Sequence, residues 1–310
     1  MKHTTLFLTL IFIAMTSTSF AQQAESLPQW KFGYVTLYQI EDTASGFAAG
    51  TFPEVDKATF DKYATDGKIP SSVSTFLLEI PGIIEIRNGV HTTGYVLFDS
   101  GMGTPNGNLI ANLGNAMRGD YQPDRVVLVL ITHLHGDHIG GLLDGNARRF
   151  PNAKVLCSKP EYDYWIKQNN ATVEKVKKAY GDDFCGGFTF DEAISIPGDK
   201  FFKDRDLVSI TPINAIGHTP GHTVFLIESA EQKLMVIGDL LHGAALQFSM
   251  PEICAGFDMD KAEAVKARRR ILDLAAEENI PVAGMHIPKP GIGFVKKNTS
   301  GGYVFSPIEK

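Results

Sequence analysis

The sequence predicts an α+β fold in which two β-sheets pack together and helices cover their outer faces. Two observations lead to this prediction. The elements come in the order strands and helices, then strands and helices again, which is typical of two sheets that share one core. The chain that remains after residues 1–21 has 289 residues (310 − 21), and this length fits one large domain at 22–310.

Residues 1–21 have the parts of a secretory signal peptide. Lys2 gives the positive start, residues 6–14 form a short apolar run, and small residues stand before the expected cleavage site at Gln22. The apolar run is shorter than a membrane span requires. We therefore expect a periplasmic or secreted protein with no membrane span after signal cleavage. A retained N-terminal anchor is the alternative.

Strand patterns dominate the first half of the mature chain. Alternating or continuous apolar runs predict strands at 31–40, 74–80, 83–87, 94–99 and 126–131. Turns are expected at Pro81-Gly82 and Asn88-Gly89, and a helix is expected at 109–117. The polar segment 41–72 breaks the strand pattern and contains one amphipathic stretch, at 57–64. We expect an irregular excursion there that covers this chain's own site or a neighbouring subunit.

Strands and helices alternate in the second half. Strands are predicted at 154–156, 207–213, 223–228, 233–237 and 281–283, and the last of these is expected to be the final strand. Helices are predicted at 159–168, 172–180 and 260–277. Residues 181–187 break the pattern. The strands 223–228 and 233–237 are near enough in sequence to form a hairpin.

The charge of the mature chain argues against a nucleic-acid partner. Residues 22–310 contain 28 basic and 35 acidic side chains, a net charge of −7, and the short basic runs resemble solvated helix faces. The three cysteines, Cys157, Cys185 and Cys254, form no Cys-x-x-Cys pair and therefore no structural zinc site. Export permits a disulfide between Cys185 and Cys254, whereas Cys157 is expected to be a buried apolar residue.

One short segment concentrates metal-binding side chains. His133, His135, Asp137 and His138 lie within six residues, directly after the apolar run 126–131. On extended backbone His133 and His135 project to the same side, and Asp137 and His138 turn away at the start of a helix. One loop can thus supply two neighbouring metal ions. These ligands suit zinc, with iron, manganese or cobalt as alternatives. A set of unrelated core and surface histidines is the competing interpretation.

Three later segments place further candidate ligands at strand ends. The turn 217–223 carries His218 and His222 between two strands, Asp239 ends a strand, and His286 follows the expected final strand. Loops at strand ends are positions where a rigid scaffold can hold ligands. The spacing therefore favours a site assembled from four separate parts of the chain.

These patterns together resemble the metallo-β-lactamase superfamily. The matching motifs are His-x-His-x-Asp-His at 133–138, Gly-His-Thr-Pro-Gly-His at 217–222, Gly238-Asp239 and the late His286. The resemblance covers roughly the whole mature chain, and it implies an αββα sandwich with two Zn²⁺ between the ends of two mixed sheets. The implied ligands are His133, His135 and His218 for the first metal, Asp137, His138 and His286 for the second, and Asp239 as a bridge.

The expected chemistry follows from two divalent ions a few ångströms apart. Such ions lower the pKa of a bridging water toward neutrality, and the hydroxide that forms is the expected nucleophile. One metal would polarise the carbonyl or phosphoryl oxygen of the substrate. Asp137 and Asp239 are the expected catalytic residues, because Asp137 can orient the hydroxide and Asp239 joins the two metals.

The resemblance also suggests supporting roles for two polar residues. Asp99 lies in an early Asp-x-Gly turn and is expected to order the metal-binding loops without binding metal. Of the two histidines in the 217–223 turn, the motif favours His218 as the ligand. This leaves His222 a supporting or packing role.

Three residues are weaker candidates. Trp165, on the expected helix 159–168, and Phe248, beyond Asp239, are candidates for the walls of a substrate pocket, although large aromatic residues are more often part of the core. His242, three residues after Asp239, either lines the site or, as we favour, has a structural role.

Within the superfamily, the chain most resembles the methyl parathion hydrolase and N-acyl-homoserine lactonase-like group. The supporting stretches are 131–141, 150–153, 161–165, 217–223, 238–240, 244–248 and 290–293. A bridging carboxylate such as Asp239 is usually lacking in β-lactamases, which disfavours that activity. The chain has no obvious tyrosine shortly after Asp239, a feature of some lactonases.

The resemblance implies an exported dinuclear-zinc hydrolase that opens lactones and esters, with N-acyl-homoserine lactones as the leading substrate class. The alternatives are a phosphotriesterase or arylesterase of the methyl parathion hydrolase type, then a β-lactamase, then a non-catalytic zinc-binding protein. The expected partner is a small-molecule lactone or ester. Because related enzymes are often dimers, a homodimer is the expected assembly to test.

Overall fold

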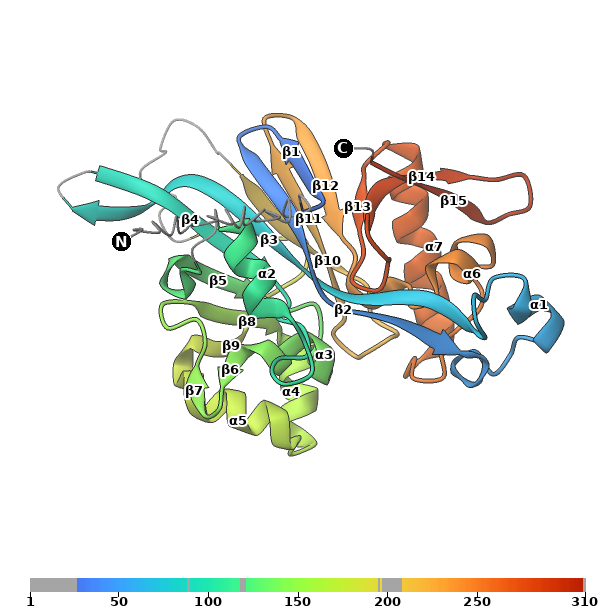
Figure 1. Cartoon of the computed structure of the whole chain (residues 1–310), viewed down its shortest axis with the longest axis horizontal. Coiled ribbons are helices and arrows are strands. Elements are labelled where there is room, and N and C mark those ends of the chain that lie inside the picture. The colour runs from blue at the N-terminus through green and yellow to red at the C-terminus, as the bar shows by residue number, and fades with distance from the viewer. Residues whose placement is uncertain (1–26, 88–89, 118–120, 195, 197–207, 309–310) are drawn as a thin grey trace, which may run out of the picture.

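The computed structural model describes residues 27–87, 90–117, 121–194, 196 and 208–308. The predicted signal peptide, residues 1–21, lies outside the described residues. In the described part the strands form two large sheets and one small hairpin made of β6 (Leu143–Asp144) and β7 (Ala147–Arg148). The two large sheets lie side by side through the middle of the molecule (Figure 1).

The first large sheet is mixed and has seven strands in the order β1-β2-β3-β4-β5-β8-β9. Its strands are β1 (Gln29–Phe32), β2 (Val35–Ala48), β3 (Lys68–Arg87), β4 (Val90–Phe98), β5 (Val126–Leu130), β8 (Lys154–Ser158) and β9 (Phe184–Phe188). The pairs from β1 to β4 are antiparallel, and those from β4 to β9 are parallel. The parallel strands end together at one edge, and the loop with the first histidines leaves β5 at that edge.

The second large sheet has six strands in the order β10-β11-β12-β13-β14-β15. Its strands are β10 (Ser209–Asn214), β11 (Thr223–Ser229), β12 (Gln232–Val236), β13 (Val282–Ala283), β14 (Ile292–Lys297) and β15 (Tyr303–Pro307). Only β12 and β13 are parallel among these pairs. The turn with His218 joins β10 to β11, and Asp239 follows β12. The second sheet therefore supplies the ligands that face those of the first.

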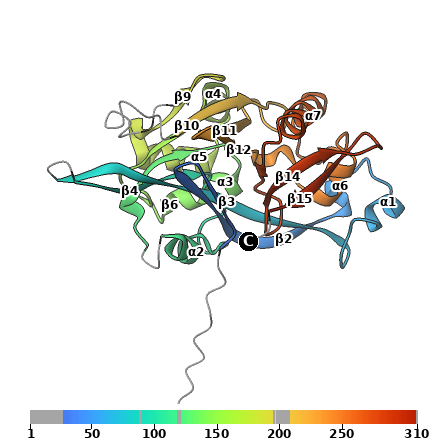
Figure 2. The ribbon, with the colours of Figure 1, turned by 90° about the horizontal axis from the view of Figure 1, so that it is seen from above.

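The helices lie outside the two sheets (Figures 1 and 2). They are α1 (Lys57–Asp61), α2 (Leu109–Ala116), α3 (Gly136–Ile139), α4 (Lys159–Lys167), α5 (Ala171–Tyr180), α6 (Ala244–Ser249) and α7 (Lys261–Glu277). The predicted helices 109–117, 159–168, 172–180 and 260–277 are all present within a residue or two. For α7, the carboxylate of Asp260 accepts a hydrogen bond from the Glu263 backbone N–H at 3.0 Å, which caps the first turn.

Three apolar clusters hold the layers together. The central cluster lies between the sheets, where the rings of Phe98 and Phe225 are 5.4 Å apart. A second cluster packs α2 and α5 on the first sheet, and a third packs α6 and α7 on the second sheet. Each fully buried side chain of this size contributes about 1.5–3 kcal/mol. Two mixed sheets between outer helices confirm the predicted α+β αββα sandwich.

β2 and β3 form a long two-stranded arm that reaches α1, at the far right of Figure 1. Their pairing runs from Thr36–Glu79 to Ala48–Lys68. The predicted excursion at 41–72 is therefore wrong at its two ends, 41–48 and 68–72, which are strand, and only residues 49–67 leave the strand pattern. The polar composition was misleading because Ser71 and Ser72 are buried and bond to main-chain carbonyls. The amphipathic stretch at 57–64 forms α1, which packs on α6 in a fourth apolar cluster.

Several expected boundaries are also wrong. The strand expected at 31–40 is two strands, β1 and β2, because Gly33 turns the chain with a φ of +51°. Pro81-Gly82 does not end a strand, since β3 continues across it with a register shift between Ile80 and Ile84. Residues 184–188 form β9, and the tail adds β14 and β15 after the expected final strand. Leu207, the expected start of β10, lies outside the described residues.

The cysteines do not form the disulfide that export would permit. All three are free: Cys185 lies on β9 of the first sheet, Cys254 lies between α6 and α7, and Cys157 is fully buried as expected. The pairing of Cys185 with Cys254 is therefore wrong. None of the helices in the described ranges is long and apolar enough to cross a membrane.

Candidate metal centre

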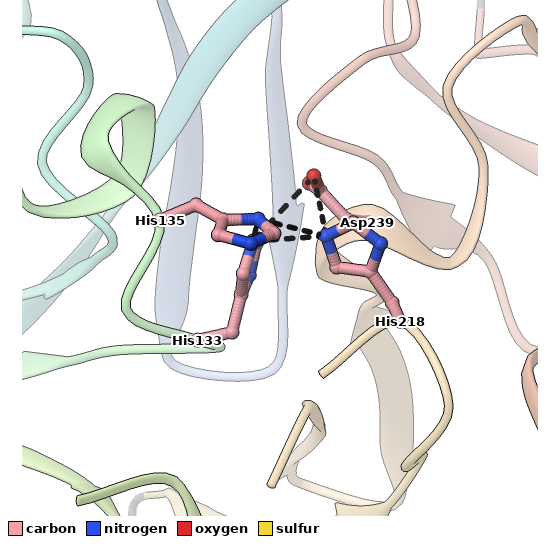
Figure 3. Close-up of side chains that lie close together, drawn as sticks. All are labelled: His133, His135, His218 and Asp239. Carbon is pink, nitrogen blue, oxygen red and sulfur yellow. Dashed lines mark hydrogen bonds and ion pairs between the residues drawn. The ribbon is translucent and has the colours of Figure 1, made fainter. Parts of the chain in front are cut away.

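Three histidine nitrogens meet at the edge where both sheets end (Figure 3). His133 Nε2 lies 2.9 Å from His135 Nδ1, and His218 Nε2 lies 3.2 Å and 3.0 Å from these two atoms. His133 and His135 leave β5 together, whereas His218 comes from the opposite sheet. Nitrogens bound to one tetrahedral zinc lie about 3.3 Å apart, given Zn–N bonds of about 2.0–2.1 Å. This first ligand set has the spacing that one metal ion requires.

A second set lies beside the first. His138 Nε2 and His286 Nε2 lie 3.7 Å and 3.6 Å from Asp137 Oδ2. His138 and Asp137 belong to α3, directly after the first histidines, and His286 follows β13 in the other sheet. The ligand atoms of Asp137, His138 and His286 all lie within 4.8 Å of one another.

Asp239 stands between the two sets. Its Oδ1 lies 3.1 Å from His138 Nε2, and its Oδ2 lies 3.1 Å from His286 Nε2 and 3.5 Å from His218 Nε2. The residue sits at the end of β12, after Gly238, whose φ of +52° and close contact with the His222 ring exclude a side chain. One carboxylate therefore faces both sets, as a bridge between two metals must.

The hydrogen bonds behind the histidines decide which nitrogen is free. His138 Nδ1 donates to Asp99 at 2.7 Å, His218 Nδ1 donates to Asp258 at 2.8 Å, and His286 Nδ1 donates to the Ser72 carbonyl at 2.7 Å. Each bond leaves the lone pair of Nε2 pointing into the site. A second hydrogen bond of this kind is the usual companion of a metal-bound histidine.

The pKa values of three residues at the site show how its charges would respond to a cation. Burial alone would lower the pKa of His138, but Asp239, Asp99 and Asp137 outweigh it and hold this pKa well above the ordinary value. Burial would raise the pKa of Asp239, but His138 and His286 hold it well below the ordinary value. Burial also lowers the pKa of His135 to about 4, so its imidazole is neutral near pH 7. Ionised Asp239 and neutral His135 are thus in the protonation states that bind metal, whereas a cation bound to His138 must displace the proton that the three carboxylates favour there.

Two buried atoms without a hydrogen-bond partner give a direct test of whether a metal fits. His138 Nε2 and Asp239 Oδ1 are both buried and lack a partner, although only 3.1 Å separates them. They point to a common space and not along a hydrogen bond. An unsatisfied buried polar atom costs about 1–3 kcal/mol, and a bound cation would satisfy both. The donor set therefore fits divalent metal ions.

The structure separates ligands from supports in two of the predicted positions. His222 Nδ1 donates to the Ala215 carbonyl, and its Nε2 accepts from the Asp239 backbone N–H at 2.9 Å. Both ring nitrogens are thus used, so His222 has no lone pair for a metal. Asp99 is fully buried and accepts bonds from Thr132 and His138. It lies behind the metal-binding loop, where the sequence pattern placed it.

The weaker candidates have mixed outcomes. The Trp165 ring lies 5.5 Å from the His135 ring, beside the site. Phe248 is buried in the third apolar cluster and stacks on Phe305, so it has the core role that was the more expected of its two and is not a pocket wall. His242 is not merely structural: its Nε2 lies 3.0 Å from Asp239 Oδ2, and its ring stacks on His286. Its place three residues after Asp239 was the available signal.

Three buried residues near the site carried no sequence signal that we used. Asp258, from the loop before α7, backs His218, and the buried Arg268 lies 3.6 Å from Asp258. Asp258 lies 40 residues after His218 in the sequence, so no short motif predicts that the two side chains meet. Glu161, on α4, bonds to the loops that carry His133 and His218. Glu161 lies in the stretch 161–165 that supports the family resemblance, but that resemblance implied no role for it.

Two aromatic side chains cover the second-sheet side of the site. Phe47, from the β2–β3 arm, lies 5.6 Å from the His286 ring and 5.9 Å from the His242 ring. Phe257 lies 4.5 Å from the His242 ring and 6.0 Å from Phe47, and 42% of its surface is exposed. An exposed apolar surface beside buried ligands suits an apolar part of a substrate.

Fold and donor set together define a two-sheet metal-binding protein with ligands at the sheet ends. Residues 83–283, well over half of the chain, match the metallo-beta-lactamase superfamily. The chain belongs to this superfamily, which confirms the resemblance seen in its motifs.

Known proteins of similar sequence point in the same direction. N-acyl homoserine lactonase AttM of Agrobacterium fabrum is 25% identical over 187 residues, which is 57% of this chain and 64% of AttM. The uncharacterized protein YobT of Bacillus subtilis is 29% identical over 156 residues, 47% of this chain and 62% of YobT. This chain thus spans a little under two thirds of the length of these relatives.

Solved structures resemble almost the whole chain. Hydrolase AbOPH, described as a member of the beta lactamase superfamily, is 26% identical with a TM-score of 0.75, covering 93% of this chain and 99% of its own. AidC, a dizinc quorum-quenching lactonase, is 24% identical with a TM-score of 0.74, covering 92% and 98%. At that identity the likeness to AidC shows the shared fold.

Proposed function

We propose that this protein is a metal-dependent hydrolase with two zinc ions that opens lactones and esters, with N-acyl-homoserine lactones as its leading substrates. The convergence of six ligand side chains around one carboxylate, Asp239, carries this proposal. The first metal would be held by His133, His135 and His218, and the second by Asp137, His138 and His286. Imidazole with carboxylate suits zinc, and the similar AidC is a dizinc enzyme.

Bound divalent ions would polarise a substrate oxygen and acidify water, which is the chemistry of ester hydrolysis at neutral pH. The chain's own residues arrange this chemistry. Asp239 holds the two ligand sets together. Asp137, whose side chain is 29% exposed, is the carboxylate that solvent can reach, and it would orient the attacking water by accepting its hydrogen bond.

The surroundings of the site support an ester or lactone with an apolar group. Trp165 borders the His135 side, and Phe47 and Phe257 border the His286 and His242 side. An acyl chain would find apolar contacts on both sides of the polar centre. The similarity to AttM, an N-acyl homoserine lactonase, favours the same substrate class.

We further propose export, because residues 1–21 have the composition of a signal peptide. A small acylated lactone is a substrate that an exported enzyme can meet outside the cell. The fraction of the chain in the periplasm or medium, and the N-terminal residue of the mature protein, would test this directly. A mature N-terminus at Gln22 is the expected result, and a cytoplasmic protein that starts at Met1 would contradict it.

Metal content and hydrolysis on one sample of residues 22–310 would test the activity. Metal is counted by mass spectrometry, and kcat/KM is measured for an acyl-homoserine lactone, an aryl ester, a phosphotriester and a β-lactam. Two zincs per chain with the lactone fastest is the expected result. The Asp239→Ala variant, prepared in parallel, gives the rate without the bridge.

The other outcomes each change the proposal. A faster phosphotriester would indicate the organophosphate-hydrolysing alternative, since the same centre can attack a phosphoryl group. Two zincs without turnover would leave a zinc-binding protein. Fewer than about one metal per chain after metal-replete preparation would contradict the two-metal mechanism itself.

A further inference from the structure

Glu161 is a buried carboxylate outside the ligand sets. It is fully buried at the start of α4, and it accepts four hydrogen bonds. Oε1 accepts from the Leu134 backbone N–H at 2.9 Å and from Trp165 Nε1 at 2.6 Å. Oε2 accepts from Thr219 Oγ1 at 2.7 Å and from the Gly221 backbone N–H at 2.8 Å. All four partners donate, which matches the acceptor capacity of an ionised carboxylate.

Three of the four donors, all but Trp165 on α4, come from the two loops that carry the first ligand set. Leu134 stands between His133 and His135, so its N–H fixes the backbone from which both rings project. Thr219 follows His218 directly, and Gly221 lies in the same turn. Each oxygen of Glu161 therefore serves a different loop, and the carboxylate joins the loop of the first sheet to the turn of the second.

The contact between α4 and the His218 turn is close enough to exclude a side chain. A Cβ atom on Gly221 would lie 2.3 Å from the Glu161 backbone nitrogen and 2.4 Å from Ser158 Oγ. Ser158 Oγ donates to the Gly221 carbonyl at 2.7 Å. This helix start is thus docked on the turn by backbone contact as well as by the carboxylate.

Trp165 extends the same network to the rim of the site. Its indole N–H is held by Glu161, four residues earlier on α4, and its ring lies 5.5 Å from the His135 ring at a steep angle. The ring direction is therefore set by the carboxylate that also holds the His133–His135 loop. One buried carboxylate thus bonds to the loops of three histidines and to the aromatic side chain beside them.

We propose that Glu161 is a positioning residue that sets the separation of His133, His135 and His218 and thereby the affinity of the first metal. This inference rests on the proposed metal centre. The carboxylate touches neither the second ligand set nor Asp239 in any bond described above. It follows that loss of Glu161 weakens one metal and spares the other, whereas a general loss of stability would weaken both.

Metal titration of the apo-protein distinguishes these outcomes without any substrate. Trp30→Phe leaves Trp165 as the single tryptophan, because the chain has two. Its fluorescence then reports an ion bound next to His135, and calorimetry with Zn²⁺ counts both ions. The variants are Glu161→Gln and, as a matched control, Glu174→Gln, which alters an exposed glutamate on α5. Glutamine keeps the shape but turns an NH₂ group toward two donors.

We expect the parent protein and the Glu174→Gln variant each to bind two equivalents of Zn²⁺ tightly. In Glu161→Gln, one equivalent is expected to weaken roughly 10–100-fold, the range found when outer partners of metal ligands are removed. The Zn²⁺ ion that binds more weakly should be the one that changes Trp165 fluorescence. Excess Zn²⁺ should restore this fluorescence change. Unchanged affinities, or equal weakening of both equivalents, would overturn the proposal.

Thr219→Val provides a milder second test if Glu161→Gln does not fold. It removes one of the four donors and keeps the charge and the shape of the turn. We expect a smaller loss of affinity in the same equivalent, and no loss would overturn the proposal. A parent that binds fewer than two metals would instead contradict the proposed centre, so the two failures are distinguishable.

Discussion

The His218 turn (residues 217–222) and the His286 loop (residues 284–291) both come from the second sheet, but they are held in place differently. The His218 turn is held by two buried carboxylates from distant elements, Glu161 on α4 and Asp258 before α7. The His286 loop is held by neutral groups of β2 and β3. The one O–H of Ser72 is shared between the carbonyls of Met285 and Ile287, and His286 Nδ1 donates to the Ser72 carbonyl.

The difference has a consequence for how each ligand responds to change. Hydrogen bonds to charged groups contribute about 1.5–3 kcal/mol, against about 0.5–1.5 kcal/mol for neutral ones. The position of His218 therefore depends mainly on two side chains, Glu161 and Asp258, and a point mutation can remove either of them. The position of His286 depends on many weaker hydrogen bonds. One of them ends on the main-chain carbonyl of Ser72, which no substitution deletes. We expect the first metal to be more sensitive to single substitutions than the second.

The largest effect is expected where the two regions meet. Asp239→Ala removes the carboxylate that faces His218 and His286 together. Both metals should bind more weakly, and kcat/KM should fall roughly a hundredfold or more. Metal counting and kinetics on the same sample check this. Retained activity with two bound metals would contradict the bridging role.

Asp258→Asn tests the His218 turn, which two buried carboxylates hold in place. The variant removes the charge that orients His218 but leaves the first ligand set in place. We expect affinity for one metal to fall about 10–100-fold, with little change at the second. Calorimetry with Zn²⁺ measures both. Asp124→Asn, a change of an exposed aspartate, is the matched control, and a loss confined to the second metal would contradict the comparison.

The contrast also explains what sequence reasoning could reach. The clustering of the side chains in 133–138 with His218 was predictable, because metal chemistry restricts the types and spacing of candidate ligands over a few residues. Asp258 could not be predicted in this way, since only the packing of α7 brings it to His218. The role of Glu161 could not be predicted for another reason. A glutamate three residues after a serine at a helix start is typical of a helix cap, and Ser158 does accept from the Glu161 N–H in the structure.

The fold shows the same division. Helices with strong periodicity, such as α7, were predicted almost to the residue, because an apolar stripe and an N-cap are local signals. The β2–β3 arm was missed because buried serines satisfy carbonyls of the His286 loop, so a core strand has a polar sequence. Phe248 remained a candidate for the pocket as well as the core, because helical spacing looks alike for a pocket wall and for a core contact.

Ser72→Ala tests the His286 loop, which many neutral hydrogen bonds hold in place. It removes a hydroxyl whose single proton is shared between two carbonyls, and the loss of this hydrogen bond should lower the free energy of unfolding by about 1–3 kcal/mol. The bond from His286 Nδ1 ends on the main chain of Ser72 and survives the substitution. We therefore expect a lower Tm with the affinity of both metals nearly unchanged, measured by thermal denaturation and calorimetry. A selective loss of the second metal would show that the hydroxyl itself positions His286.

The smallest effect is expected at the rim, where no ligand is held. Phe257 is 42% exposed, and its ring contacts His242 and Phe47 beside the centre. Phe257→Ala removes apolar area worth about 1 kcal/mol to a bound acyl chain, so KM should rise about fivefold for long-chain lactones. Short-chain lactones should be little affected, because they do not reach the ring, and metal affinity should not change. Equal effects on short and long chains would mean that Phe257 acts through His242 on the metal centre and does not contact the substrate.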